Sequence, residues 1–572
     1  MPKIEVFQEA LFARMGKKLS NDELETLLEC AKAELDDVDD ENGLFKIELN
    51  DTNRPDLWST AGLARQLSVY SGMRTEPRSY NFFSRPGDTP QAGYRIQVDA
   101  TVKDIRPFVV GFAVSGKPID EASLNDIIQT QEKLCWNFGQ KRRAIAMGVY
   151  RRDLITFPIH YKAVDPDSTR FQPLGLEKAM NMREILKDHP KGQEFGHIVA
   201  DSPVFPLLTD ARGEVLSFPP VINSSRIGAV EVGDRELFVE LTGTEIHSLL
   251  VAASIVACDL ADSGFTIHPT VVEYPFDTPF GREIQVPMYF QKPQSLGLSA
   301  ANRLLGTDMS GAEAVAALAR MGVPAEITGQ DITVVPPEYR NDFLHGVDIA
   351  EDIMVGKGMD YFTPEMPGDF SVGRLTAAEE LSRKVKMLMV GLGFQEMIFN
   401  YLGSDKDYFL RMYPEDALEA ARAGAVQIAN PMSENYAVVR PSILPSLLSA
   451  ESISASAAYP HKIFEVGKIA RTDPEDVQGS VTENTLGWVH TDAETDFTQV
   501  SSQLSALLYY LGKEYHLEPI DDPRFISGRV GAVMINGQSL GVIGEIHPRV
   551  LDSWGVHVPI TAGELCLDLL HE

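Results

Sequence analysis

The pattern of hydrophobic and polar positions at the start of the chain predicts a mixture of helix and strand. Ser20 followed by Glu23 has the spacing of a capping box, which marks the start of a helix. Hydrophobic and polar residues alternate from Leu44 to Leu49, as in a strand with one buried face, whereas Leu57 to Tyr70 has helical spacing. A polar segment rich in turn-forming residues, Arg78 to Gly93, is the first predicted linker.

The rest of the chain continues the mixture, with strands dominating its second segment. From about residue 94 to residue 275, alternating runs predict strands, and two helical stretches break the pattern at Asn125 to Phe138 and Glu245 to Leu260. Further helices are predicted near 299–305, 311–321 and 344–355, with a strand at ITVVPP. After a Pro-rich turn at 363–368, a helix precedes a series of antiparallel strands. The pattern predicts a multidomain α+β protein.

Composition excludes several classes of protein. The chain has 572 residues, of which 44% are hydrophobic and 23% charged, as in ordinary globular proteins. Its 51 Lys and Arg against 82 Asp and Glu give a formal charge of −31. A protein that binds phosphate backbones broadly and by itself gathers Lys and Arg, so this charge argues against that class. The charge does not exclude an acidic subunit of a complex in which a partner protein binds the nucleic acid.

Cysteine spacing and targeting signals indicate a cytoplasmic protein. The four cysteines are scattered without metal-binding spacing, which argues against zinc knuckles and a disulfide framework: Cys30, Cys135, Cys258 and Cys566. The N-terminus lacks the layout of a signal peptide. The longest apolar run, Leu249 to Cys258, is too short for a membrane helix, which needs about 20 residues. We therefore expect a soluble protein with no membrane contact.

Common catalytic motifs are missing from the sequence. It contains no phosphate-binding P-loop, no G-x-G-x-x-G and no H-E-x-x-H motif. Gly537 to Gly541 matches G-x-S-x-G, the pattern of a hydrolase nucleophile elbow. The Asn536-Gly537 pair lies between two apolar or alternating runs, however, which predicts a β-hairpin instead. We therefore assign no nucleophile to Ser539.

A cluster of carboxylates forms the sharpest candidate site. Asp348, Glu351 and Asp352 lie three and four positions apart and share one face of the predicted helix, with Asp342 at its entry. Like charges at this spacing repel, so a cation would stabilise them. An all-oxygen set without His or Cys favours Mg²⁺. A solvated acidic face at a helix start explains the same residues equally well.

Two other segments have candidate binding chemistry. Small and polar residues from Leu207 to Thr244, in SFPPVINSS and ELTGTE, could line a pocket for a polar small molecule, although ordinary loops have the same composition. The basic residues of Lys141 to Arg143 and of Arg151-Arg152 could contact RNA phosphates. A solvated loop or a set of salt bridges is the simpler explanation of this basic stretch.

Five stretches together resemble one protein family. They are ELNDTNRPDLWSTAGLARQL, QEKLCWNFGQKRRAIAMGVYRRDLITFPIHY, PLLTDARGEVLSFPPVINS with ELTGTE, PPEYRNDFLHGVDIAEDI, and NPMSENYAVVRPSILPSLL with KIFEVGKIA. In this order they resemble the β subunit of phenylalanyl-tRNA synthetase, of the archaeal and eukaryotic-like type. The narrower type is suggested because the chain lacks the oligonucleotide-fold insertion and the C-terminal ferredoxin-like domain of bacterial β subunits.

The resemblance implies four domains and a partner. It suggests an N-terminal α/β domain (1–90), a strand-rich tRNA-editing domain (91–275), a small helical Mg²⁺-bearing domain at a subunit interface (276–362) and a class II synthetase-like antiparallel domain (363–572). Such β chains form an (αβ)₂ heterotetramer with α subunits, which bind ATP and join phenylalanine to tRNA(Phe). Arg440 resembles the arginine of one class II motif. The later Gly-rich motif, whose arginine helps to hold ATP in active members, is missing, and Arg549 is the only basic candidate for that arginine in the last 40 residues. No synthetic catalytic residue is therefore expected in this chain.

The resemblance also suggests roles for individual residues. An editing pocket that hydrolyses tyrosine mischarged onto tRNA(Phe) would comprise Leu208, Ser217, Glu240 and Thr242. Glu240 would accept a hydrogen bond from the tyrosine hydroxyl, where family members often have Asp. No Ser-His or Cys-His pair is visible, so a positioned water would attack. Asp342, Asp348, Glu351 and Asp352 would hold a structural Mg²⁺ at the contact with the α subunit.

Two alternatives compete with this interpretation. One is a scaffold subunit without editing activity, which the Asp-to-Glu difference at position 240 keeps open. The other is a free-standing Mg²⁺-dependent hydrolase that would use the carboxylates near Asp348.

Overall fold

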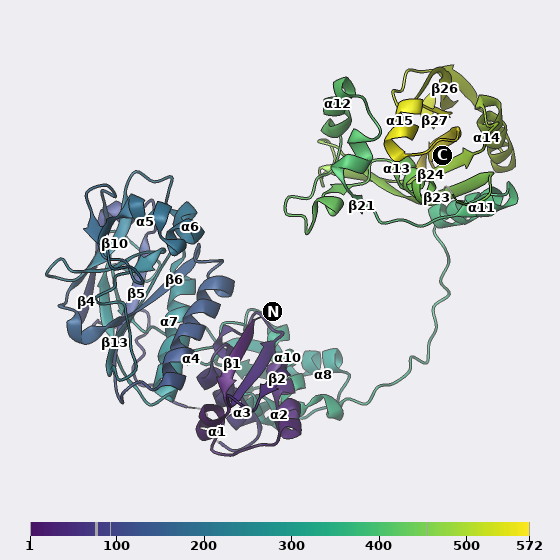
Figure 1. The fold of residues 1–572 in the computed structure, drawn as a ribbon. Coiled ribbons are helices and arrows are strands. Elements are labelled where there is room, and N and C mark those ends of the chain that lie inside the picture. The colour runs from purple at the N-terminus through teal and green to yellow at the C-terminus, as the bar shows by residue number, and fades with distance from the viewer. Residues whose placement is uncertain (1, 75–77, 92, 455, 571–572) are drawn as a thin grey trace. The chain divides into compact units, whose positions relative to one another are not determined.

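The computed structural model describes residues 2–74, 78–91, 93–454 and 456–570. The chain forms two compact units, Met1–Glu365 and Met366–Glu572 (Figure 1). Residues 363–376 between their regular elements are exposed and contain neither helix nor strand. One residue of the linker predicted at 78–93, Ala92, lies outside the described residues.

The first part of the N-terminal unit is a small antiparallel sheet with three helices. The sheet has the order β1-β3-β2, with β1 (Lys3–Phe7), β2 (Ala33–Asp39) and β3 (Leu44–Leu49). Its helices are α1 (Gln8–Met15), α2 (Asn21–Leu28) and α3 (Thr60–Tyr70). The capping box is confirmed, because the Ser20 amide donates to Glu23 Oε2 at 2.8 Å and the Glu23 amide donates to Ser20 Oγ. The helix α3 begins later than predicted, because Ser59 caps it.

Two stacked sheets make up the middle of this unit. The larger has the order β12-β11-β10-β7-β4-β15-β16, with β4 (Tyr94–Val98), β7 (Ile159–Val164), β10 (Phe205–Thr209), β11 (Val215–Phe218), β12 (Ile222–Asn223), β15 (Thr270–Glu273) and β16 (Glu283–Val286). The smaller has the order β14-β5-β13-β6, with β5 (Phe108–Ser115), β6 (Ile145–Arg151), β13 (Glu236–Gly243) and β14 (Thr266–His268). A two-stranded ribbon joins β8 (Arg170–Phe171) and β9 (Met180–Asn181).

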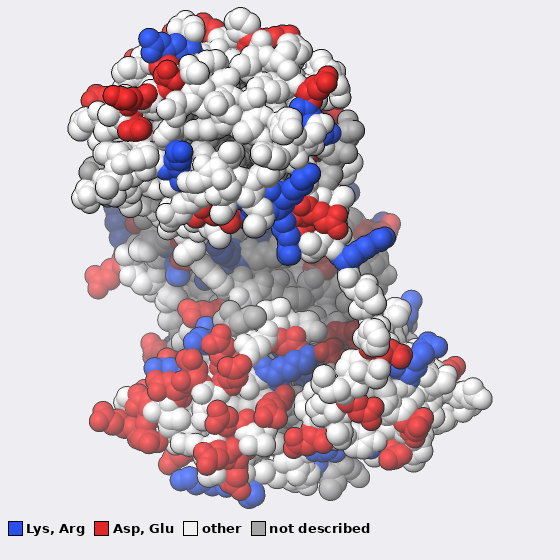
Figure 2. All heavy atoms as spheres, turned by 90° about the vertical axis from the view of Figure 1, so that its right-hand side faces the viewer, with Lys and Arg blue, Asp and Glu red and all other residues white. Residues whose placement is uncertain are grey.

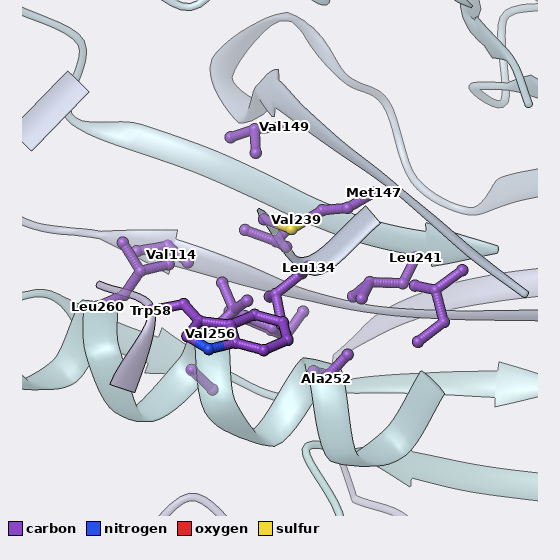
Figure 3. Packing of buried hydrophobic residues seen from close by; sticks show 14 of the residues in the cluster. Trp58, Val114, Leu134, Met147, Val149, Val239, Leu241, Ala252, Val256 and Leu260 are labelled. Carbon is purple, nitrogen blue, oxygen red and sulfur yellow. The ribbon is translucent and has the colours of Figure 1, made fainter. Parts of the chain in front are cut away.

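A long apolar helix covers the smaller sheet. The helix α7 (Ile246–Asp262) packs on β5 and β13, which are buried at nearly every position. Figure 3 shows Ala252 and Val256 on this helix close to Trp58, with the strands that carry Val114 and Val239 beside them. Every residue of β13 after Glu236 is buried, so polar side chains in this part of the strand are removed from bulk water. The predicted helix at 245–260 is confirmed.

The helices of the strand-rich segment differ from the prediction in two ways. The helix α4 (Glu121–Lys133) starts before Asn125 because the Asp120 carboxylate caps it, and a π-helical turn extends it to Phe138. Two helices, α5 (Met182–Asp188) and α6 (Pro190–Phe195), were not predicted. They have 7 and 6 residues, too few to show a helical period in the sequence.

The last part of the N-terminal unit is a helical layer on a small sheet. The sheet has the order β17-β19-β18, with β17 (Gln294–Gly297), β18 (Ala325–Thr328) and β19 (Asp331–Val334). The helices are α8 (Leu298–Leu305), α9 (Gly311–Arg320) and α10 (Gly346–Lys357). All three predicted helices and the predicted strand are therefore present.

The C-terminal unit is built on one large sheet. Its order is β20-β23-β24-β28-β27-β26-β25, antiparallel except where β20 meets β23. The strands are β20 (Gln395–Glu396), β23 (His461–Thr472), β24 (Ser480–Thr491), β25 (His516–Pro519), β26 (Phe525–Ile535), β27 (Gln538–Ile546) and β28 (Ile560–Cys566), and a separate pair joins β21 (Leu402–Gly403) and β22 (Val438–Val439). The helices are α11 (Ala377–Gly391), α12 (Leu418–Ala423), α13 (Leu444–Ile453), α14 (Phe497–Leu511) and α15 (Pro548–Trp554).

The G-x-S-x-G motif lies in a hairpin, as predicted. Asn536 and Gly537 have positive φ values of 50° and 80° and connect β26 to β27. Ser539 pairs with Met534 in the ladder and is not exposed on a strand-to-helix turn. Among the described helices, none is both long and apolar enough to span a bilayer. The multidomain α+β class is confirmed, whereas the four domain boundaries stay predictions.

Candidate binding pocket and carboxylate cluster

A cavity of about 390 Å³ lies where β6 and β13 face the loop after β11. Three of the four predicted pocket residues line it: Ser217, Glu240 and Thr242. Leu208 does not line the cavity; it is fully buried on β10, opposite Ser217 in the strand register. The structure therefore brings the three polar predicted residues together in the cavity wall and leaves the apolar one outside it, on the strand next to Ser217.

Glu240 is the central polar group of this cavity. It lies on β13 with 2% of its surface exposed, and its Oε2 accepts a hydrogen bond from the Tyr150 hydroxyl at 2.7 Å. Burial raises the pKa of Glu240 to about 7, although the Tyr150 hydrogen bond and the nearby Arg106 charge oppose this rise. Burial and the adjacent carboxylate also raise the pKa of Tyr150, which keeps it a neutral donor. Glu240 can thus change its charge near neutral pH.

Gly148 makes the approach of Tyr150 to Glu240 possible. It pairs with Glu240 across β6 and β13, and it shares a strand face with Tyr150 two residues later. A Cβ at this position would overlap the Tyr150 hydroxyl and lie 2.8 Å from Glu240 Oε2. Any larger residue would therefore separate the phenol from the carboxylate.

Two hydroxyl groups lie in the wall of the cavity beside Glu240. Arg106, itself buried, donates from Nε to Thr242 Oγ1 at 2.9 Å and from Nη1 to the Arg143 carbonyl at 3.0 Å. The Thr242 hydroxyl keeps its own proton as a donor. The Ser217 hydroxyl is buried and forms no hydrogen bond of standard geometry with a described residue, although it is close enough to Tyr150 to oppose the rise in the pKa of that phenol. Both hydroxyls are available to a bound ligand or water.

The cavity has the groups for binding and for positioning water, but not for covalent catalysis. Its described lining contains neither His nor Cys, so it offers no Ser-His or Cys-His pair. Sequence reasoning missed Tyr150, Gly148 and Arg106. The alternation in GVYRR shows that Gly148 and Tyr150 share a face, but their pairing with β13 is visible only in the fold.

The basic stretch divides into two different groups. Arg151 and Arg152 form ion pairs with Asp234 at 3.4 Å and Glu236 at 2.5 Å, which fits the salt-bridge explanation. Lys141 to Arg143 take part in no ion pair within the part of the chain that the structure describes. Gln140, Lys141 and Arg142 have positive φ values of 51°, 55° and 67°, a conformation that costs about 1–2 kcal/mol per residue.

The four predicted metal ligands are not gathered into one site. Arg340, 1% exposed, holds two of them: its Nη2 lies 2.6 Å from Asp342 Oδ2 and 3.1 Å from Asp352 Oδ1. Burial alone would raise the pKa of Asp342, but Arg340 outweighs it and lowers this pKa to about 2. For Asp352, burial prevails and its pKa is raised. A guanidinium thus supplies the cation that the carboxylates require.

The other two predicted ligands lie nearer the surface of α10. Asp348 Oδ2 accepts from the amides of Leu344 at 2.7 Å and His345 at 2.6 Å, which fixes the start of the helix. Glu351 contacts the Lys32 ammonium group. Among the described residues, no three His, Cys, Asp or Glu side chains converge as a metal site would require. The oxygen chemistry of Asp348 and Glu351 fits Mg²⁺, whereas Asp342 and Asp352 are committed to Arg340.

Arg440 is buried and is bonded to groups of its own unit. It is fully buried and pairs with Glu465 on β23, with its Nη1 and Nη2 at 2.8 and 2.9 Å from the two carboxylate oxygens. Its Nε donates to the Lys468 carbonyl at 2.7 Å. All three nitrogens of its guanidinium group therefore have hydrogen-bond partners within the C-terminal unit.

Comparisons with known proteins cover the whole chain. Three family models match it: "Phe-tRNA synthetase beta subunit B1 domain" at 1–73, "tRNA synthetase B5 domain" at 295–359 and "Phenylalanyl tRNA synthetase beta chain CLM domain" at 364–567. A phenylalanine–tRNA ligase β subunit of Borrelia hermsii is 44% identical over 573 residues, covering 100% of both chains. That of Treponema pallidum is 42% identical and covers 99% of both.

A solved structure is similar to part of the chain. The N-terminal fragment of the phenylalanyl-tRNA synthetase β subunit from Pyrococcus horikoshii is 36% identical, with a TM-score of 0.59, and covers 62% of this chain and 100% of that one. The full-length relatives named here are from spirochaete bacteria, so their names do not support the narrower archaeal and eukaryotic-like type. Because the sequence is 42–44% identical to these relatives over nearly the full length of both chains, the chain belongs to the family of phenylalanine–tRNA ligase β subunits.

Proposed function

We propose that the cavity around Glu240 hydrolyses tyrosine from mischarged tRNA(Phe), while an α subunit carries the synthetic site that uses ATP. The observation that supports this proposal is the placement of one carboxylate, with a pKa of about 7, beside two hydroxyls in a cavity of about 390 Å³. A phenylalanine pocket rejects an added hydroxyl only weakly, by about 100-fold, so a second site that binds this hydroxyl improves accuracy.

Discrimination follows from the geometry of Glu240. Its Oε2 is occupied by Tyr150, and no described residue donates to its Oε1. A tyrosine side chain in the cavity can donate its hydroxyl proton to Oε1, whereas phenylalanine leaves this buried oxygen without a partner. A hydrogen bond to a charged group contributes about 1.5–3 kcal/mol, which favours the tyrosine ester by about 10- to 100-fold.

Hydrolysis then needs a water near the ester carbonyl. Ser217 and Thr242 are the hydroxyls that can hold it, because Ser217 lacks a partner and Thr242 is oriented by Arg106. Positioning of the water and the substrate is the source of catalysis in this scheme. A scaffold subunit without editing is the alternative, but a decayed pocket would not need to retain a buried carboxylate with a dedicated donor.

Glu240→Ala tests the proposal in the complex with the α subunit. We expect deacylation of Tyr-tRNA(Phe) to fall by about 10-fold or more, because the acceptor for the tyrosine hydroxyl is lost. Glu132→Ala is the matched control, since Glu132 is an exposed carboxylate on the rim of the same cavity. Wild-type deacylation that Glu240→Ala leaves unchanged would contradict the assignment, and no wild-type deacylation would favour the scaffold alternative.

We also propose that the chain works as part of an (αβ)₂ heterotetramer in the cytoplasm, with tRNA(Phe) as its nucleic acid. The membership in a family of β subunits supports an α partner. The four domains drawn at 1–90, 91–275, 276–362 and 363–572 would divide the work into scaffold, editing, subunit contact and synthetase-like support. Similarity to the Pyrococcus horikoshii fragment supports a domain order shared with that protein.

Asp348 and Glu351 are the residues that could hold Mg²⁺ at the subunit contact. Mg²⁺ is commonly bound by one or two carboxylates with water completing its shell, and these two residues lie three positions apart on α10 and are partly exposed. The ion would neutralise their charge and link them to oxygens of the partner. Calorimetric titration with MgCl₂ should show binding that Asp348→Asn and Glu351→Gln each weaken, whereas Glu313→Gln, an exposed carboxylate on α9, should not. Equal binding by all variants would contradict this site.

A further inference from the structure

A second cavity, of about 480 Å³, lies in the C-terminal unit and is called the C-terminal cavity below. The strands β23, β24, β27 and β28 contribute to its lining, together with the segment 408–413 and the start of α13. Its volume falls within the range of about 300–1,000 Å³ that is typical of small-molecule sites. All of its lining belongs to the C-terminal unit, so it is separate from the cavity that contains Glu240.

The C-terminal cavity holds a cation and a carboxylate side by side. Arg524 Nη1 lies 3.6 Å from Glu564 Oε2, and the two side chains are only 13% and 12% exposed. Asp522 fixes the other side of the guanidinium, because Arg524 Nη2 donates to Asp522 Oδ2 at 2.7 Å. Glu564 Oε1 accepts from the Ile443 amide at 2.6 Å, and the Ser442 hydroxyl lies 2.9 and 3.0 Å from the two carboxylate oxygens. Arg524 Nη1 and Glu564 Oε2 are therefore held in place, and each can still bind a further group.

A buried hydroxyl without a partner lines the same cavity. Thr485 on β24 is 1% exposed, and its Oγ1 forms no hydrogen bond with a described residue. In the strand register Thr485 lies opposite Cys566 of β28, which also lines the cavity. A buried hydroxyl that stays unbonded is unfavourable, which indicates that a polar group binds here.

Much of the remaining wall is apolar or aromatic. The side chains that form it include Phe409, Met412, Tyr413, Ile469 and Val542. An apolar wall with a few convergent polar groups is typical of a pocket that orients a small molecule. Such a molecule would place its charged groups at the ion pair and its apolar body against this wall.

We infer that the C-terminal cavity binds a free α-amino acid with an apolar side chain. An α-amino acid carries an ammonium and a carboxylate on one carbon, so it requires an acceptor and a donor close together. Glu564 Oε2 accepts from the ammonium group, and Arg524 Nη1 donates to the carboxylate. The Thr485 hydroxyl bonds to the same charged end of the ligand. The inference concerns the C-terminal unit alone and does not depend on the proposed editing function.

The charges around the C-terminal cavity favour a zwitterion over an anion. Arg471 and Glu483 line it as a second ion pair, in addition to Arg524 and Glu564, and Asp522 pairs with Arg524. Among the described residues of the lining and their ion-pair partners, three carboxylates thus accompany two guanidinium groups. A phosphate or a dicarboxylate would be repelled by this excess of negative charge, whereas a zwitterion has no net charge.

Isothermal titration calorimetry of the full chain tests the site. The probes are L-phenylalanine and L-leucine. Each is compared with its analogue without the ammonium group, 3-phenylpropanoate or 4-methylpentanoate, and with its analogue without the carboxylate, 2-phenylethylamine or 3-methylbutylamine. We expect at least one of the two amino acids to bind, and its analogues to bind about 10-fold more weakly or worse, since each lacks one charged hydrogen bond. Binding of neither amino acid, or equal binding of an analogue, would overturn the inference.

Thr485→Val separates ligand binding from folding. The hydroxyl has no partner in the free chain, so the variant should unfold at no lower temperature than the wild type. Its affinity for the amino acid should nevertheless fall by about 5-fold, as for one lost hydrogen bond. Thr491→Val is the matched control, because Thr491 is also a buried threonine of β24 without a partner among the described residues, but does not line the cavity. No loss of affinity in Thr485→Val, or an equal loss in the control, would overturn the site.

Glu564→Gln tests the acceptor of the ammonium group. It keeps the shape of the side chain and removes its charge, so the affinity should fall by about 10-fold or more. Glu545→Gln is its control: Glu545 is likewise 12% exposed and paired with an arginine, Arg529, but lies outside the cavity. Glu240→Ala should also leave the affinity unchanged. A loss in Glu240→Ala without one in Glu564→Gln would move the binding to the N-terminal unit and contradict the inference.

Alkylation of Cys566 locates the ligand in the complex with the α subunit. Cys566 lines the C-terminal cavity and is half-buried, whereas Cys30, Cys135 and Cys258 are buried. A saturating concentration of the amino acid should slow the reaction of Cys566 with iodoacetamide several-fold, as read by mass spectrometry of this chain. An unchanged rate would place the ligand elsewhere and overturn the site, whatever the result of the deacylation assays.

Discussion

Glu240 is a carboxylic acid whose ionised form the fold disfavours. Its side chain is almost completely buried. Among the described residues, the hydrogen bond from Tyr150 is the one direct contact that stabilises its negative charge. Tyr150 also fixes the direction of the carboxylate, because it occupies Oε2 and Gly148 leaves room for it. A preformed acceptor needs no rearrangement when a tyrosine hydroxyl arrives, which is how a site gains specificity at low cost.

Tyr150→Phe should shift the pH dependence of editing. The ionised Glu240 is the better acceptor, so deacylation of Tyr-tRNA(Phe) in the wild type should rise as the pH passes through about 7. Removing the Tyr150 hydroxyl removes a contact that lowers the pKa of Glu240, so this pKa rises further and the half-maximal rate moves to higher pH. The rate near neutral pH should fall several-fold. The measurement is the initial rate between about pH 6 and 9, corrected for uncatalysed ester hydrolysis.

Tyr161→Phe is the matched control for this shift. Tyr161 is also a buried tyrosine, but its hydroxyl donates to the Arg106 carbonyl at 2.8 Å and does not contact Glu240. In the Tyr161→Phe variant, the rate of deacylation should reach half its maximum at the same pH as in the wild type. A Tyr150→Phe profile that superimposes on the wild type after scaling would show that the tyrosine only fills space.

At this scale, sequence reasoning found residues whose motif is local and missed those defined by strand pairing. Ser217, Glu240 and Thr242 come from two short motifs and line one cavity. Tyr150 meets Glu240 only because β6 pairs with β13 in one register, and no local pattern specifies that register.

The helix α10 depends on a buried arginine outside it. Arg340 precedes the helix, yet its guanidinium holds Asp342 before the helix and Asp352 within it. The sequence correctly indicated that the clustered carboxylates need a cation. It did not show that a neighbouring arginine provides one, because the path of the chain between Arg340 and α10 decides which groups meet.

Arg340→Met should destabilise the layer formed by α9 and α10. Two buried carboxylates would lose their partner, at a cost of about 3–5 kcal/mol. Their pKa values would then rise above the ordinary 3.8, because burial acts without the opposing charge. A buried carboxyl with a raised pKa destabilises the fold mainly when it is ionised, and at low pH it becomes protonated. The loss of folding stability in Arg340→Met should therefore be smaller at about pH 5 than at about pH 8. Hydrogen exchange of the α10 amides at both pH values measures this.

Lys357→Met on the same helix is the control. Lys357 pairs with the half-exposed Glu313 at 3.4 Å, and surface pairs contribute about 0–1 kcal/mol. Exchange in α10 should therefore stay close to the wild type at both pH values. Faster exchange in Lys357→Met than in Arg340→Met would contradict the role of the buried arginine.

Elements with strong local signals were predicted well, and short ones were not. Capping boxes, amphipathic helices and the Asn-Gly hairpin are properties of neighbouring residues, so α2, α9 and the β26–β27 turn are in the expected places. The short helices α5 and α6 and the π turn after α4 depend on caps and packing instead.

For the whole molecule, net charge and local charge have different consequences. Asp and Glu side chains are spread widely over the face drawn in Figure 2, with Lys and Arg among them in small groups. A net charge of −31 limits non-specific binding to nucleic acid. It does not prevent a strained turn from presenting a few unpaired cations beside a cavity. Composition therefore described the average surface correctly and gave no information on the rim of the cavity.

The division into two units predicts that editing survives without the C-terminal one. Every residue assigned to the cavity and its rim lies within Met1–Glu365, and residues 363–376 are exposed and irregular, so a cut there breaks few contacts. We expect the fragment 1–365 to fold, with hydrogen exchange in β6 and β13 as in the full chain, and to hydrolyse Tyr-tRNA(Phe) with a similar kcat and a higher KM. The fragment 366–572 should not hydrolyse this substrate. A soluble, folded 1–365 fragment that lacks hydrolysis while the complete complex retains it would mean that the C-terminal unit or the α subunit completes the site.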